Sequence, residues 1–239
     1  FGTKSEHADK FFLEKAFELS GKIDDANTQV LILNELGKIN AITDRVEDAF
    51  QNYEAVLKLK DLVNQPGVEA DALFNLAGLY VKKGEYNKAI TYYKKSLGIW
   101  RSFGNRAQEA RLLNEIGSVY ERMENVERAL ANYTAALEVY QGVDQKKGIA
   151  ESYNNIGALY YQQKKTQQAV ENLELALSAG HTSQTKDPVR KSYEYLSLCF
   201  KELGNYQKAL EYKDLFIAMN DFIQKEESDQ KLLEVQNRY

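Results

Sequence analysis

Apolar and polar positions follow one another with helical spacing along this chain, and the same arrangement returns at a fixed interval of about 40 residues. A Leu or Ile followed by a small residue occurs five times at this interval, as Leu36-Gly37, Leu76-Ala77, Ile116-Gly117, Ile156-Gly157 and Leu196-Ser197. An alanine follows each Leu or Ile at one constant offset, at Ala49, Ala89, Ala129, Ala169 and Ala209. A fixed period of this kind is typical of repeat proteins, in which each repeat is one supersecondary unit.

Each repeat has the pattern of two amphipathic helices. Large apolar residues stand three positions before each Leu or Ile, and aromatic residues stand four positions after it at Tyr80, Tyr120, Tyr160 and Phe200. Spacings of three and four place these side chains on one helical face. The alanine is followed at the same spacings by Tyr53, Tyr93, Tyr133 or Leu173. The small residues of both helices therefore let neighbouring helices approach closely.

Turn-forming residues separate the helices. Gly84 and Gly204 stand between the two helices of their repeats, and Asp44, Glu124 and Lys164 occupy the matching positions. Glycine at such a position suits the end of a helix. Between repeats we expect turns at Asn64 to Gly67, Phe103 to Asn105, Gly142 to Asp144 and Lys186 to Pro188. The chain is thus predicted to form five hairpins of antiparallel helices.

The Leu-Gly pair, the aromatic residue four positions later, and the Ala and Tyr of the second helix resemble the tetratricopeptide repeat, in its 40-residue variety. The resemblance covers nearly the whole chain. It implies an all-α fold, a right-handed superhelical α-solenoid of helix hairpins whose first helices line a concave, peptide-binding side.

The expected organisation has three parts. Residues 1–25 form an N-terminal capping helix, and residues 221–239 form a charged C-terminal helix that is either a cap or a linker to a further domain. Between them lie five repeats, at about 26–65, 66–105, 106–145, 146–185 and 186–220. The end repeats depart from the pattern, because Asn40 stands where an aromatic is expected and Lys213 replaces the second-helix tyrosine, beside Tyr212. Terminal repeats are often atypical.

Polar residues recur on the first helices at positions that packing does not use. Asparagine amides both donate and accept hydrogen bonds, which suits holding the backbone of an extended peptide. The candidate ligand-binding residues of the groove are Asn34, Lys38, Asn75, Arg111, Asn114, Arg122, Asn154, Asn155, Tyr161, Lys191 and Tyr195. Two alternatives stay open: the asparagines bond to the adjacent helix or to water, and the charged residues form mutual surface ion pairs of modest energy.

One type of ligand is not expected. Family members that clamp a C-terminal carboxylate carry Lys three residues before the small residue of the first helix and Asn just after it. The corresponding pairs here are Asn34 and Lys38, Phe74 and Gly78, Asn114 and Ser118, Asn154 and Ala158, and Glu194 and Leu198. The resemblance therefore implies a different peptide ligand.

Composition argues against several other functions. The 239 residues carry 31 Lys and Arg against 35 Asp and Glu, mixed along the chain, so nucleic acid is not an expected partner. No apolar run is long enough to span a membrane, and no signal-peptide pattern opens the chain. There are two histidines and a single cysteine, and Cys199 falls on a core-facing position. We therefore expect no enzymatic activity, no metal site and no cofactor.

The residue pattern of the repeats and the charged C-terminal segment resemble the sensory region of bacterial membrane-bound histidine kinases. This resemblance implies a non-enzymatic, protein- or peptide-binding sensor module of a two-component system, which would be periplasmic. The abrupt first and last residues suggest a piece of a longer protein. The alternative is a cytoplasmic scaffold or a peptide-responsive regulator of the quorum-sensing kind. A third hypothesis is a homodimer formed through the C-terminal helix.

Overall fold

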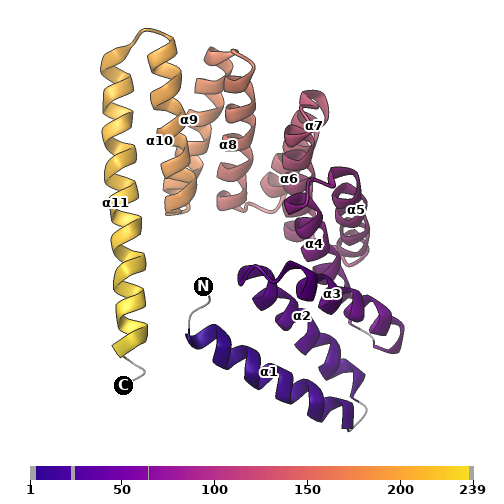
Figure 1. Cartoon of the computed structure of the whole chain (residues 1–239). Coiled ribbons are helices and arrows are strands. Elements are labelled where there is room, and N and C mark those ends of the chain that lie inside the picture. The colour runs from indigo at the N-terminus through magenta and orange to yellow at the C-terminus, as the bar shows by residue number, and fades with distance from the viewer. Residues whose placement is uncertain (1–3, 23–24, 64, 237–239) are drawn as a thin grey trace. The chain divides into compact units, whose positions relative to one another are not determined.

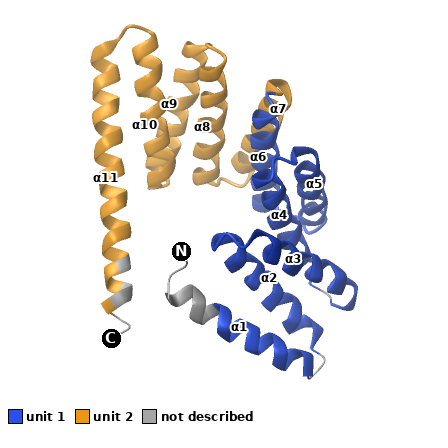
Figure 2. Cartoon of the chain, viewed as in Figure 1, with its two compact units in different colours: residues 1–124 blue, residues 125–239 orange. Residues whose placement is uncertain are grey.

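The computed structural model describes residues 4–22, 25–63 and 65–236 and forms two compact units, which divide between Glu124 and Asn125 (Figure 2). In the described residues every regular element is a helix, so the predicted all-α fold of consecutive hairpins is confirmed (Figure 1). Unit 1 contains α1 (Lys4–Lys22), α2 (Ala26–Ile42), α3 (Val46–Leu59), the 3₁₀ helix η1 (Lys60–Leu62), α4 (Pro66–Lys82), α5 (Tyr86–Ser102) and α6 (Arg106–Arg122). Unit 2 contains α7 (Val126–Gly142), α8 (Lys146–Gln162), α9 (Thr166–Thr182), α10 (Lys186–Glu202) and α11 (Tyr206–Gln236).

The backbone geometry repeats after each helix and the connection that follows it, so its period is half that of the side-chain pattern. The helices α2 and α4 to α10 each take 17 residues. Together α3 and η1 span the same length, and a connection of three residues follows each of these helices. The middle residue of the connection has a left-handed backbone at Asp44, Gly84, Gly104, Glu124, Asp144, Lys164, Gln184 and Gly204, with φ between 52° and 74°. The predicted turn positions within the hairpins are therefore confirmed.

Most connections are closed by the same hydrogen bonds. In the turn after α4, the Gly84 N–H donates to the Val81 carbonyl at 3.0 Å and the Glu85 N–H donates to the Tyr80 carbonyl at 2.9 Å. This Schellman arrangement satisfies carbonyls that the end of a helix leaves open. Between repeats, the turn at Phe103 to Asn105 lies where it was predicted, and the turn predicted at Gly142 to Asp144 is shifted by one residue, because Gly142 is the last residue of α7. Two other predictions extend into helices, since Pro66 and Gly67 begin α4 and Lys186 to Pro188 form the first turn of α10.

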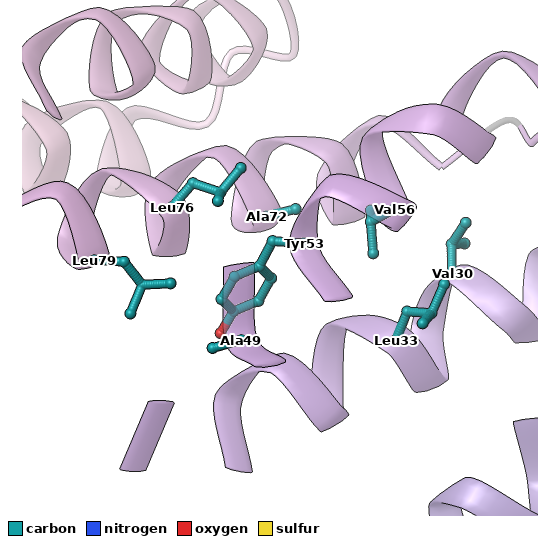
Figure 3. Packing of buried hydrophobic residues seen from close by; sticks show 8 residues of the cluster. All are labelled: Val30, Leu33, Ala49, Tyr53, Val56, Ala72, Leu76 and Leu79. Carbon is teal, nitrogen blue, oxygen red and sulfur yellow. The ribbon is translucent and has the colours of Figure 1, made fainter. Parts of the chain in front are cut away.

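The core of unit 1 joins first and second helices through the predicted positions. Figure 3 shows Tyr53 of α3 among Leu33, Ala49, Leu76 and their neighbours. Tyr53 is 1% exposed, and its ring lies so close to α2 that a Cβ added at Gly37 would stand 2.5 Å from Tyr53 Cε1. The glycine is thus required by the tyrosine that it faces.

The core of unit 2 uses the same principle with an aliphatic residue. A Cβ added at Gly157 of α8 would stand 2.8 Å from Leu173 Cγ of α9. Leu173 packs in a buried cluster with Ala169, Leu196 and Phe200. Apolar contact between the small residue of one helix and the large residue of the next therefore recurs in both units.

The atypical end repeats have specific partners. Asn40 is buried, and its Oδ1 accepts a hydrogen bond of 2.8 Å from Lys10 Nζ of α1, which explains the polar residue at an aromatic position. At the other end, Lys213 is exposed, and Tyr212 stacks on Phe200 with ring centroids 5.5 Å apart. The last helix, α11, continues without a break from Tyr206 to Gln236, so the charged C-terminal segment extends the fifth hairpin.

Replacement of Gly37 by Ala tests the close contact between α2 and α3. The added methyl group would enter the space of a fully buried ring, so Gly37→Ala should lower the free energy of unfolding by roughly 1 to 3 kcal/mol. Gly98, in the interior of α5, is the matched control, because a Cβ added there meets nothing within 4 Å. Gly98→Ala should instead stabilise by about 0.5 to 1 kcal/mol through lower backbone entropy in the unfolded chain. Urea unfolding measures both, and equal effects would contradict this assignment.

Substitutions at the left-handed turn residues should change stability in opposite directions. An L-residue with a left-handed backbone is disfavoured by roughly 1 to 2 kcal/mol relative to its preferred conformation. Gln184→Gly should therefore raise the free energy of unfolding by about 0.5 to 1 kcal/mol, and Gly84→Ala should lower it by about 1 kcal/mol. Thermal melts of both variants give the sign. A stabilised Gly84→Ala variant would be inconsistent with the φ of 74° at this residue.

Candidate ligand-binding surfaces

The first helices of unit 2, α8 and α10, enclose a hollow that contains three of the predicted groove residues. Its volume is about 170 Å³, and it is lined by Glu151, Asn154, Asn155, Asp187, Pro188, Arg190 and Lys191. Lys191 Nζ donates to Asn155 Oδ1 at 2.9 Å, and Arg190 Nη2 lies 3.6 Å from Asp187 Oδ1. The hollow thus offers two acidic and two basic side chains with amide groups between them, which suits a polar ligand of mixed charge.

Asn154 connects α8 to α10 rather than facing solvent. It is 1% exposed, its Nδ2 donates to the Pro188 carbonyl at 2.8 Å, and its Oδ1 accepts from Ser192 Oγ at 2.8 Å. For Asn154 the alternative interpretation therefore holds, in which the asparagine bonds to the adjacent helix rather than to a ligand. Asn154 therefore forms the buried wall of the hollow and positions the first turn of α10.

Tyr161 and Tyr195 meet further along the same pair of helices. Their rings pack edge to face with centroids 5.9 Å apart, and both residues are half-buried. Beside them, Glu202 of α10 accepts hydrogen bonds from Lys164 Nζ at 2.8 Å and from Thr166 Oγ1 at 3.0 Å, which lower the pKa of its carboxyl. The two tyrosines are thus held on a fixed helix pair and present a partly exposed aromatic surface.

In unit 1 the predicted residues gather around Phe74 and Asp71 of α4. The Arg111 guanidinium of α6 lies 4.2 Å from the centre of the Phe74 ring, a cation–π contact. Burial raises the pKa of the Asp71 carboxyl, and the charges of Lys38 and Arg111 oppose that rise. Lys38 also pairs with Glu35 at 2.6 Å, which agrees with the ion-pair alternative.

The remaining predicted residues of unit 1 differ in exposure. Arg122, the last residue of α6, is exposed, and Asn75 of α4 is half-buried. Asn34 and Asn114 are buried. The two buried side chains therefore belong to the wall of the first-helix surface rather than to its open face.

Asn34, unlike Asn154, has a buried polar atom that no hydrogen bond from a described residue satisfies. It is 4% exposed, and its Oδ1 has no hydrogen-bond partner among the described residues. Ala72 follows Asn34 at the same offset in the sequence at which Ser192 follows Asn154. The hydroxyl that satisfies Asn154 is thus replaced by a methyl group at the matching position in unit 1.

Sequence reasoning missed Asp187, Pro188, Arg190 and Ser192. The first two were assigned to a turn, and the structure places them in the first turn of α10 beside α8. A signal for Ser192 exists in the sequence, because the serine stands at a fixed offset from the asparagine of the preceding repeat. Its meaning depends on knowing that consecutive first helices pack together.

The side chains of Cys199 and His181 pack against neighbouring residues. Cys199 is buried, and burial, with a smaller effect of the Glu202 charge, raises the pKa of its thiol to about 12. His181 lies in the last turn of α9 with its Nε2 3.3 Å from the Tyr193 hydroxyl, and the side chain of His7 lies outside the described residues. A protonated, buried thiol is a poor nucleophile.

Neither a metal-binding cluster nor a membrane-spanning helix occurs in the described chain. In residues 4–22, 25–63 and 65–236 no group of three or more His, Cys, Asp or Glu side chains is placed to hold a metal ion. Over the same part of the chain, no helix combines the length and the apolar character required to cross a membrane.

Exchange of alanine and serine between the two units tests the account of Asn34. Ala72→Ser should place a hydroxyl beside the unsatisfied Oδ1 and raise the free energy of unfolding by about 1 kcal/mol. Ser192→Ala should lower it by about 1 to 2 kcal/mol, because Asn154 Oδ1 then loses its donor. Urea unfolding of both variants measures the effects. A destabilised Ala72→Ser variant would contradict the proposed register.

The model of the tetratricopeptide repeat matches the chain at residues 24–102, 68–141 and 108–180, which together cover more than half of it. No curated protein matches the sequence. BtubC (BKLC) from P. vanneervenii has a similar structure, with a TM-score of 0.78, 21% identity, and coverage of 93% of this chain and 93% of that one.

Two further similar structures are longer than this chain. A STAND protein with a tetratricopeptide repeat sensor from Pyrococcus horikoshii has a TM-score of 0.75 and 21% identity over 87% of this chain and 33% of that one. Aspartyl phosphate phosphatase F from Bacillus subtilis has a TM-score of 0.75 and 15% identity over 87% of this chain and 55% of that one. This chain thus spans about a third and about half of their lengths.

At these identities the three structures share the fold alone with this chain, whereas the family model also matches its sequence. The helix hairpins, their small and aromatic contact positions and this match agree. The chain belongs to the tetratricopeptide repeat family, whose members are protein-interaction modules.

Proposed function

We propose that the chain is a non-enzymatic module that binds a protein or peptide on its first helices and acts as the sensor region of a bacterial signal-transduction protein. The observation that carries the proposal is the hollow between α8 and α10, where Asn155 holds Lys191 at its rim. Solenoid repeats commonly use such surfaces to bind extended partners.

The chemistry of the hollow suits a polar segment of an extended peptide. Lys191 Nζ can exchange its bond to Asn155 Oδ1 for a bond to a peptide carbonyl, and the released Oδ1 can accept from a peptide N–H, so little reorganisation is needed. Glu151 and Asp187 oppose Arg190 and Lys191, and this balance favours a segment of mixed charge. Tyr161 and Tyr195 lie on the same two helices and offer an aromatic contact to an apolar side chain of the ligand.

Unit 1 carries a second polar surface of the same kind. Arg111 lies on the Phe74 ring. The charges of Lys38 and Arg111 also oppose the rise that burial causes in the pKa of the Asp71 carboxyl. A ligand carboxylate could bind Arg111 without losing the cation–π contact, because the guanidinium has five N–H donors. Both units therefore present first-helix surfaces that suit a peptide.

The sensor role is supported by the route from the hollow to α11. Asp187 and Pro188 line the hollow, and Lys186 of the same helical turn pairs with Glu226 of α11 and lies 4.6 Å from the Phe222 ring. A ligand that shifts the first turn of α10 therefore changes contacts along the C-terminal half of α11. The similarity to a STAND protein with a repeat sensor is consistent with this role.

The alternative is a scaffold or a peptide-responsive regulator that uses the same surfaces without a membrane. The sequence of the complete gene separates the two. A membrane-spanning segment followed by a kinase domain would support the sensor role, whereas a DNA-binding domain would overturn it and leave the binding function intact.

A peptide-array screen with the intact chain, followed by calorimetry on the best peptide, tests the binding function. Lys191→Ala and Asn155→Ala should each weaken binding about tenfold, the usual effect of losing one hydrogen bond to a charged or amide group. Lys201→Ala is the control, because Lys201 is an exposed cation of the same helix outside the hollow. Equal affinity of all variants, or no peptide bound, would refute the assignment of this surface.

A further inference from the structure

The second helices of unit 1 carry a hollow that the first-helix surface does not include. It lies between α3 and α5 above α4, with a volume of about 570 Å³. Its lining residues are Leu57, Lys60, Glu69, Leu73, Lys95, Gly98, Ile99 and Ser102. Pockets of this size accept a side chain of a bound partner with space to spare.

The hollow has an apolar floor and an open centre. Leu57, Leu73 and Ile99 supply the floor, and Leu73 is buried. Gly98 stands in α5 where a Cβ would meet nothing within 4 Å. An apolar side chain from outside could therefore enter without displacing a side chain of this protein.

The part of the hollow that α5 lines is basic, because Lys95 is the charged residue there and α5 contains no acidic residue. Two other cations of α5 lie outside the lining, where Lys88 pairs with Glu85 and Arg101 with Glu109. Across the hollow, Lys60 Nζ and Glu69 Oε1 pair at 2.9 Å and neutralise each other. Lys94 and Lys95 have no ion-pair partner among the described residues, and Lys95 Nζ lies 5.2 Å from the centre of the Tyr92 ring. Lys95 thus stands beside the apolar floor without a carboxylate partner, and Lys94 precedes it in α5.

We propose that this hollow is a second binding site, which takes an acidic peptide segment with an aliphatic side chain at its centre. The aliphatic side chain packs on Leu57, Leu73 and Ile99, and flanking carboxylates pair with Lys94 and Lys95. Charge complementarity selects an acidic partner, because the cations at the rim repel basic segments. The site lies on the second helices and is independent of the proposed binding surface on the first helices.

Unit 2 contains the matching hollow with different chemistry. It is lined by Gln141, Asp144, Lys146, Ile149, Leu175, Ser178, Ala179 and Thr182, with a volume of about 370 Å³. Leu175, Ser178 and Ala179 stand two repeats after Lys95, Gly98 and Ile99, at the same positions of the pattern. The second helix here, α9, contains Glu171 and Glu174 and neither Lys nor Arg. Lys146, the cation in the lining, pairs with Asp144 at 2.6 Å, so the hollow of unit 2 serves as an internal control for an acidic peptide.

The test uses the intact chain and a fluorescein-labelled peptide of sequence Gly-Asp-Glu-Leu-Asp-Glu-Gly. Two control peptides replace its leucine with serine or its four acidic residues with lysine. Anisotropy at low salt should show binding of the acidic leucine peptide and at least roughly tenfold weaker binding of both controls. Trp100, the one tryptophan of the sequence, follows Ile99 in α5, so its fluorescence gives a second readout without a label.

Variants locate the site. Gly98→Phe fills the open centre and Lys95→Glu reverses a rim charge, so each should weaken binding by roughly tenfold or more. Ser178→Phe makes the matched change in unit 2 and should leave affinity unchanged, as should Lys191→Ala on the first-helix surface. Thermal melts confirm that each variant folds, and Lys94→Glu, at an exposed residue, replaces Gly98→Phe if that variant melts early.

Equal binding of the serine peptide, or an equal loss with Ser178→Phe, would overturn the proposal. It is also overturned if sodium oleate, a lipid-like anion, changes Trp100 fluorescence and the peptide does not. An effect of Lys191→Ala alone would assign the probe to the first-helix surface, which overturns the second site and leaves the proposed function standing.

Discussion

Close contact between a small residue of one helix and a large residue of the next is the constraint on which this fold depends. The Tyr53 ring leaves no space for a methyl group at Gly37, and Leu173 leaves none at Gly157. Apolar burial of these side chains stabilises each hairpin. Because this contact takes up the regularly repeated positions, the residues that vary between repeats remain available for binding.

Because of the turn geometry, each unit has two kinds of surface, one on its first helices and one on its second helices. A helix of fixed length and a left-handed turn of three residues return the chain in the opposite direction, so first and second helices alternate. First helices carry amides and charges held by hydrogen bonds, as at Asn155 and Lys191. Second helices leave hollows between them, and the basic hollow beside α5 differs from its neutral to acidic counterpart beside α9. Repetition of the backbone therefore permits different chemistry at matching positions.

The candidate site could be predicted in part. The first helices, their asparagines and the residues Lys191, Tyr161 and Tyr195 follow from the register of the repeat, and the structure places them on α8 and α10. The depth of each asparagine could not be predicted, because it depends on the side chain of the following repeat. Ser192 satisfies Asn154, whereas Ala72 leaves the Asn34 Oδ1 without a partner among the described residues.

The sequence by itself determined the helices, their period, the residues of the core and most turns, because these depend on local spacing and on apolar side chains that recur at fixed intervals. Only the tertiary structure decided which asparagines are buried, that Asn40 pairs with Lys10, that Arg190 joins the hollow and that α5 flanks an open space. The physical reason is distance along the chain. Hydrogen bonds and hollows arise between helices that are neighbours in space but separate in sequence, and side-chain periodicity within one helix carries no information on the groups that its neighbour presents.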